Sequence, residues 1–207
     1  MGKALAAWLL IAAAAAAPTT PRDTVQSAVT RVVQTLEELD DHRAEATPAA
    51  RAAREHVRGE IRRIATGLFD FEEVGRRALG RHWAGRSADE QAEFLSLFTD
   101  LLERAYVGRI EAYSGEKIIY TGELVDGEYA TVRSRVNSQR RAEMALDYRL
   151  HRAGDRWKVY DVLLDGVSFV STYRSEFNRI IQLHSWDELM HRLRKKQIQV
   201  RTVLDRP

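Results

Sequence analysis

The stretch from Trp157 to Phe177 changes its hydrophobic period midway, and this restricts the folds open to the chain more than any other feature. Its first part reads as a strand, and the change falls at Asp165-Gly166. Beyond that dipeptide, apolar residues recur at steps of three and four, as on one face of a helix. They are Val170, Tyr173, Phe177, Ile180 and Ile181. A strand that leads into a helix predicts a domain in which helices pack on a sheet.

The middle of the chain carries the remaining strand signals. Apolar residues alternate with polar ones in short runs, and turn residues separate the runs. Asp126-Gly127 is a strong hairpin turn and Gly154-Asp155 a weaker one. Turns of this length join antiparallel neighbours. The predicted strands cover residues 117–124, 128–136, 142–151 and 156–163.

Helical patterns come before and after these strands. Thr47-Pro48 places a capping residue before a proline at the first helical position. Asp70 with Glu73, and Ser87 with Glu90, have the spacing of capping boxes. Helices, an antiparallel meander and further helices predict an α+β fold with a four-stranded sheet. Six helices are expected. The first carries Val25 to Leu39, the second runs from Pro48 to Leu68, and the third is short and ends near Gly80. The fourth runs from Ser87 to Tyr113, the fifth bears the apolar stripe from Val170 to Ile181, and the sixth follows Ser185.

Residues 1–17 have the features of an export signal. Met1-Gly2-Lys3 is a short basic start, Ala4–Ala13 is an apolar core of signal length, and Ala16 or Ala17 offers a cleavage site. The alternatives are an alanine-rich helix or a membrane anchor, but the run is short for a bilayer span. The chain has no cysteine to carry a lipid anchor or form a disulfide. We expect a cleaved signal and one domain over residues 18–207, free in the periplasm.

The charge distribution excludes one large class of function. The net charge of +2 does not suit a nucleic-acid-binding protein. Basic residues do gather near the end of the chain, where they form either a solvated helix face and tail or a weak, transient contact with acidic headgroups or an acidic partner. They are Arg192, Arg194, Lys195, Lys196 and Arg201.

Groups that carry catalytic chemistry are sparse. No Gly-x-Ser-x-Gly elbow or glycine-rich phosphate loop occurs. The histidines form neither His-x-His nor His-Glu-x-x-His, so we expect no metal and no cofactor. They are His42, His56, His82, His151, His184 and His191.

Asp161 is the one titratable residue in an apolar setting. Strand alternation predicts that it shares a face with Trp157, Val159 and Leu163. Burial there would raise the pKa of the carboxyl and suit it to act as a base. The other interpretation is a structural aspartate, paired with an arginine such as Arg174 or satisfied by a backbone amide.

Two blocks of this sequence resemble the MlaC family. One is Val167-Ser168-Phe169-Val170-Ser171-Thr172-Tyr173-Arg174-Ser175-Glu176-Phe177, which follows the strand Trp157–Asp161. The other is Phe69-Asp70-Phe71-Glu72-Glu73-Val74 through Ala78-Leu79-Gly80, followed by Phe94 to Ser114-Gly115. The order and spacing of the blocks carry the resemblance, which spans roughly residues 50–192.

The resemblance implies a soluble periplasmic phospholipid carrier of the type also called toluene-tolerance proteins. It implies a curved sheet wrapped by helices, similar to the nuclear-transport-factor-2-like cone, with an apolar cavity for acyl chains. The implied partners are an outer-membrane lipoprotein complex and an inner-membrane ABC transporter complex.

An apolar stripe is normally core, so the residues alone leave core and cavity undecided. Given the implied cavity, period and alternation select the residues expected to contact lipid. They are Phe71, Val74, Leu79, Phe98, Leu102, Tyr106, Val132, Val136, Met144, Leu146, Tyr148, Val159, Leu163, Val167, Val170, Tyr173 and Phe177.

Two other functions fit parts of the pattern. The first is a small enzyme of the same cone fold, an isomerase or dehydratase with Asp161 as base. The export signal and the lack of a second catalytic group count against it. The second is a structural module of the cell envelope that binds no ligand.

Overall fold

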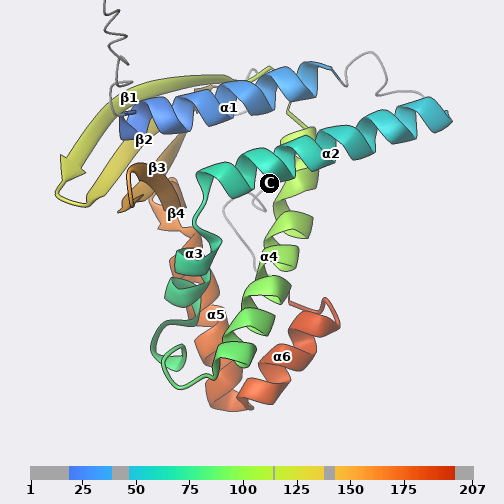
Figure 1. Cartoon of the computed structure of the whole chain (residues 1–207), viewed down its shortest axis with the longest axis vertical. Coiled ribbons are helices and arrows are strands. Elements are labelled where there is room, and N and C mark those ends of the chain that lie inside the picture. The colour runs from blue at the N-terminus through green and yellow to red at the C-terminus, as the bar shows by residue number, and fades with distance from the viewer. Residues whose placement is uncertain (1–18, 39–46, 114, 138–142, 199–207) are drawn as a thin grey trace, which may run out of the picture.

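The computed structural model describes residues 19–38, 47–113, 115–137 and 143–198, and the predicted signal at residues 1–17 lies outside them. The elements follow the predicted order and confirm the α+β class (Figure 1). The helices are α1 (Pro21–Glu37), α2 (Pro48–Leu68), α3 (Phe71–Leu79), α4 (Ala88–Glu111), α5 (Phe169–Leu183) and α6 (Trp186–Arg194), with a 3-10 turn at Gly80–His82. The strands are β1 (Lys117–Asp126), β2 (Tyr129–Asn137), β3 (Met144–Ala153), β4 (Arg156–Leu164) and β5 (Val167–Ser168).

The strands form one antiparallel sheet in the order β1-β2-β3-β4-β5. The short strand β5 was not predicted, and it moves Val167 out of the closing helix and into the sheet. Asp165 and Gly166 both have positive φ, 47° and 79°, which fits the two-residue turn of a hairpin. The chain therefore returns to pair with β4 before α5 begins at Phe169.

The helix starts are set by local sequence, as predicted. Ser87 and Glu90 form a complete capping box at α4, and Thr47 caps α2 ahead of Pro48. At α3, Asp70 accepts from the Glu73 backbone N–H at 2.9 Å. That box is only half formed, because the Glu73 carboxylate pairs with Arg76 and Arg77 instead.

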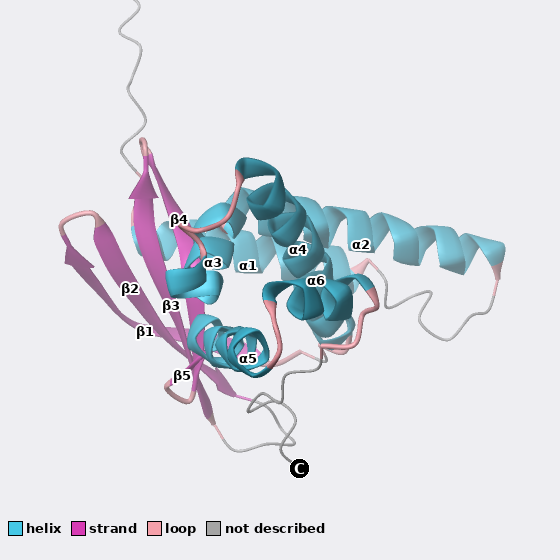
Figure 2. Cartoon of the chain, turned by 90° about the horizontal axis from the view of Figure 1, so that it is seen from below, coloured by secondary structure: helices cyan, strands magenta, loops and turns pink. Residues whose placement is uncertain are grey.

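The helices pack on the sheet from two directions. α1 lies across the sheet (Figure 1), over the face that we call the inward face. α3 and α5 lie beside β4, with α4 and α6 beyond them (Figure 2). α3 and α4 approach closely at Gly75, where a Cβ would meet Leu95 Cδ2 at 2.3 Å. Any larger residue at Gly75 would require the Leu95 side chain to move.

Two ion pairs tie α2 to α4 in addition to apolar packing. Arg58 Nε lies 2.6 Å from Glu111 Oε1, and Arg62 pairs with Glu103. Both arginines are more than half exposed, so each pair contributes at most about 1 kcal/mol. The α2–α4 contact is therefore held only weakly by charge.

Candidate functional site

The apolar residues that the structure describes fall into separate clusters rather than one continuous core. A helical cluster joins α3, α4, α5 and α6 around Phe94, Phe98 and Phe177. A sheet cluster joins α1 to the inward face around Val132, Tyr148 and Val159. A small third cluster joins α1 and α2, with Ile110 and Tyr113 of the α4 end packed against it. The space where such clusters meet is the natural place for a ligand of apolar character.

An open cleft of about 410 Å³ lies between α1 and the start of β1. α1 forms one wall, which carries both apolar and amide side chains. Tyr113 and Glu116, from the connection after α4, and Ile118 and Tyr120 of β1 form the other. The α1 wall consists of Gln26, Val29, Thr30, Val33, Gln34 and Glu37.

Half-buried apolar residues continue from this cleft across the inward face of the sheet. In the ladder, Ile118 lies opposite Val136, which lies opposite Met144. The next row runs from Tyr120 through Ser134 and Leu146 to Leu164. Neighbouring strands are about 4.8 Å apart, so a row over four strands spans about 14 Å. Val136, Met144 and Leu146 are only half-buried although they face inward, whereas Ser134 and Leu164 of the second row are each 1% exposed. This part of the inward face is therefore covered unevenly.

Aromatic rings from two helices stack between the helical cluster and the sheet cluster. Tyr106 of α4 stacks on Phe169 at the start of α5, with 5.1 Å between ring centroids. The Tyr106 hydroxyl lies 3.4 Å from that of Tyr173. Tyr106 packs against the helical cluster and Phe169 against the sheet cluster. The stack therefore bridges the two clusters.

The structure divides the seventeen expected lipid-contact residues into three groups. Those packed inside a cluster are Val74, Leu79, Phe98, Val132, Tyr148, Val159, Val170, Tyr173 and Phe177. Those that are half-buried and lie along the row or on α4 are Leu102, Tyr106, Val136, Met144 and Leu146. The remaining three residues lie elsewhere. Phe71 stacks on Phe69, Leu163 lies on the opposite face of the sheet, and Val167 is exposed in β5.

Sequence reasoning missed the cleft itself. It omitted Val29 and Val33 of α1 and Ile118 and Tyr120 of β1. The alternation of Ile118 and Tyr120 in the first strand was a usable signal for an inward face. No local pattern could indicate that α1, about ninety residues earlier, supplies the facing wall.

Asp161 does not lie on the face predicted for it. Arg149 lies opposite Asp161 but Leu150 lies opposite Val159, so Tyr160 is an extra residue and forms a bulge. The bulge reverses the alternation, which places Asp161 on the face opposite Trp157 and Val159. The prediction that these residues share a face was wrong, because alternation assumes an unbroken ladder.

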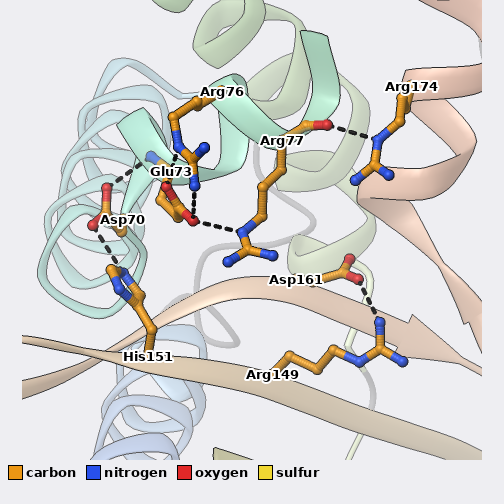
Figure 3. Close-up of polar contacts among 8 residues, drawn as sticks. All are labelled: Asp70, Glu73, Arg76, Arg77, Arg149, His151, Asp161 and Arg174. Atoms are coloured by element: carbon orange, nitrogen blue, oxygen red, sulfur yellow. Dashed lines mark hydrogen bonds and ion pairs between the residues drawn. The ribbon is translucent and has the colours of Figure 1, made fainter. Parts of the chain in front are cut away.

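The Asp161 carboxylate is 4% exposed and fully engaged. It accepts from Ser168 Oγ at 2.6 Å and from the Val170 N–H at 3.1 Å. Its arginine partner is Arg149, at 3.5 Å, and not Arg174, which donates to the Arg77 carbonyl (Figure 3). Asp161 thus joins the start of α5 to the sheet, which is a structural role.

We expect Asp161→Ala to lower the free energy of unfolding by about 1–3 kcal/mol, because it leaves the buried Val170 N–H without its acceptor. Urea unfolding followed by circular dichroism measures this change. Arg149→Ala, which removes only a partly exposed partner at 3.5 Å, should cost less than about 1 kcal/mol. Equal losses for the two variants would contradict the assignment of the amide and hydroxyl contacts as the main ones.

A second set of polar contacts fastens α3 beside the sheet (Figure 3). His151 Nε2 lies 3.0 Å from Asp70 Oδ2, and the Arg77 guanidinium lies 4.0 Å from the Tyr160 ring centroid. Burial acts to raise the pKa of Glu73, but hydrogen bonds from Arg76 and Arg77, together with their charges, outweigh it and hold that pKa below its usual range. These groups are paired with one another and fasten α3 to β3 and β4.

The basic residues near the chain end are partly used within the fold. Arg192 pairs with Glu188, and Arg194 with Glu93 of α4. Lys195 is exposed, and the predicted contribution of Arg201 lies outside the described residues. The pairs found here support the interpretation of a solvated helix face.

Within residues 19–38, 47–113, 115–137 and 143–198, no group of three or more His, Cys, Asp or Glu could hold a metal ion. No helix in that part of the chain is both long enough and apolar enough to cross a bilayer.

Comparison with known proteins gives consistent matches. The family model described as MlaC protein matches residues 26–195. The chain is 25% identical over 149 residues to the intermembrane phospholipid transport system binding protein MlaC of Haemophilus influenzae, covering 70% of each chain. It is 24% identical over 185 residues to the toluene tolerance protein ttg2D of Pseudomonas putida, covering 88% of this chain and 81% of that one.

A solved structure agrees with these sequence matches. It is a phospholipid-binding protein from Ralstonia solanacearum in complex with a phospholipid, with a TM-score of 0.72 and 26% identity. The match covers 84% of this chain and 94% of that chain. The family model covers well over half of the sequence, and the resemblance seen in the sequence blocks is confirmed. The chain belongs to the MlaC family, a family of lipid-binding carriers and not of enzymes.

Proposed function

We propose that this chain is a periplasmic phospholipid carrier that buries acyl chains between α1, α4 and the inward face of the sheet. The observation that carries the proposal is the set of half-buried apolar residues, Ile118, Val136, Met144 and Leu146, that continues from the cleft along the inward face. The proposed lipid contacts from the sheet are Val136, Met144 and Leu146, and those from α4 are Leu102 and Tyr106. The fully packed members of the earlier prediction serve mainly as core.

The physical demand on such a carrier is large. A diacyl phospholipid exposes roughly thirty methylenes, and each costs about 0.8 kcal/mol in water, on the order of 25 kcal/mol in total. A carrier needs a dry groove and an opening for the headgroup, and no catalytic group. The cleft of about 410 Å³ is near the small end of ligand pockets. Both chains fit only if the cleft widens along the half-buried residues Val136, Met144 and Leu146.

The relatives support the pathway as well as the ligand. The Haemophilus influenzae protein is described as part of intermembrane phospholipid transport, and the Ralstonia solanacearum structure holds a phospholipid. By family likeness, this chain would exchange lipid with an inner-membrane ABC transporter complex and an outer-membrane lipoprotein complex. Cleavage after a signal at residues 1–17 would leave the domain over residues 18–207 to cross the periplasm.

The test begins with protein purified from the periplasmic fraction of the bacterium that encodes it. Its intact mass should correspond to a chain that starts near Ala17 or Pro18. Organic extraction and mass spectrometry should recover diacyl phospholipid at close to one molecule per chain. A full-length chain in the membrane pellet would contradict the location. A periplasmic protein that carries no lipid, and takes none from phospholipid vesicles, would contradict the carrier function.

A further inference from the structure

Tyr120 is an unusual residue in the wall of the cleft. Its ring lines the cleft between α1 and β1, while its hydroxyl oxygen is out of contact with solvent. That hydroxyl has no hydrogen-bond partner among the residues the structure describes. Buried polar groups in folded proteins are nearly always paired, so an unpaired one calls for an explanation.

Tyr120 lies in the edge strand β1, at the beginning of the row that continues through Leu146. Ser134, opposite Tyr120 in the ladder, donates its own hydroxyl to the Leu146 carbonyl. Burial raises the pKa of Tyr120 to about 12, although the charge of Arg22 acts against this. Burial also raises the pKa of the neighbouring Tyr148 phenol. The Tyr120 phenol is therefore protonated at physiological pH and is available as a donor.

We propose that the Tyr120 hydroxyl donates a hydrogen bond to an ester carbonyl oxygen of the bound lipid, so that the site prefers ester-linked acyl chains to ether-linked alkyl chains. This inference rests on the proposed function. An ester carbonyl is a good acceptor, and it is the polar group nearest the acyl chain. An ether oxygen is a poorer acceptor and lacks the carbonyl, so an ether lipid leaves the phenol unpaired.

The order of groups from Arg22 past the cleft wall to the row on the inward face matches the order of groups in such a lipid. The exposed Arg22 places its guanidinium 5.8 Å from the Tyr120 ring centroid, a position suited to the phosphate. The phenol comes next, and the apolar row from Leu146 toward Leu164 follows. Phosphate, ester and acyl chain would then each meet a group of fitting chemistry.

The experiment uses vesicles with equal amounts of a diacyl and a dialkyl phosphatidylcholine of the same chain length. The purified protein is incubated with them and re-isolated, and mass spectrometry gives the ratio of the two bound lipids. We expect the wild-type ratio to favour the diacyl lipid about fivefold relative to Tyr120→Phe, the effect of one neutral hydrogen bond. Comparing the two proteins cancels any difference between the lipids within the vesicle.

Two further variants make the result specific. Tyr129→Phe removes a hydroxyl from a half-exposed tyrosine on the opposite face and should keep the wild-type ratio. Arg22→Gln should reduce the uptake of both lipids alike and leave their ratio unchanged. Thermal unfolding of Tyr120→Phe should show no loss of stability, because the removed hydroxyl had no protein partner.

The possible results separate this inference from the proposed function. A diacyl preference lost only in Tyr120→Phe supports the ester contact. Equal ratios in wild type and Tyr120→Phe, with both proteins loaded, overturn the ester contact and leave the carrier function intact. If neither lipid is recovered from the wild type or from any variant, both the carrier function and this inference are overturned.

Discussion

Leu146→Asp is expected to give a folded protein that has lost most of its co-purifying phospholipid. Leu146 is half-buried in the row that continues from the cleft, between Ser134 and Leu164 in the ladder. A carboxylate there either stays hydrated and excludes the acyl chains, or is buried unpaired at a cost of several kcal/mol. A cleft wall tolerates the first outcome, because water can reach it when no lipid is bound. Lipid per chain, measured by extraction, should fall at least tenfold.

Asp147→Leu is the matched control for this change. Asp147 is the next residue on β3 and lies on the opposite face, across from Arg133 and Leu163. The lipid content of the Asp147→Leu variant should stay near that of the wild type. If Leu146→Asp unfolds the protein, Leu146 is core and the row is not a lipid site. A folded Leu146→Asp with its full lipid complement would place the acyl chains elsewhere.

Phe98→Ala is expected to have the largest effect on stability. Phe98 is 2% exposed and lies 5.1 Å from the ring centroids of both Tyr173 and Phe177, in edge-on contact. Removing a ring from such a cluster costs about 3–5 kcal/mol, a large share of the 5–15 kcal/mol typical of a whole domain. Chemical unfolding monitored by circular dichroism should show this loss in the protein without lipid.

Leu102→Ala, one helical turn further along α4, provides the comparison. Leu102 is half-buried, so its truncation should cost less free energy of unfolding than Phe98→Ala does and should lower lipid content more. The reverse order, with Phe98→Ala stable but empty of lipid, would show that the helical cluster opens to admit the acyl chains. Together these variants separate core from lipid contact among residues that the sequence treats alike.

Local sequence determined most of the secondary structure. Ser87 with Glu90 satisfies the first N–H groups of α4 from within four residues, so its start needs no tertiary contact. Asp126-Gly127 likewise sets the β1–β2 hairpin, because Gly127 adopts the positive φ of 56° that the turn requires. The sequence blocks around Asp70 and Val167 also carried the family, which the comparisons confirm.

Tertiary structure decided the features that depend on residues far apart in the chain. The bulge at Tyr160 turned Asp161 to the other face, where a contact with the start of α5 satisfies it; alternation cannot reveal an inserted residue. The sequence pattern places both Phe98 and Leu146 on the apolar face of their element, so it treats them alike. One is enclosed by α5 and the other is only half covered. Burial is the sum of what every neighbouring element covers, so only the packing of α1 over the sheet and of α5 against α4 distinguishes a cleft wall from a core.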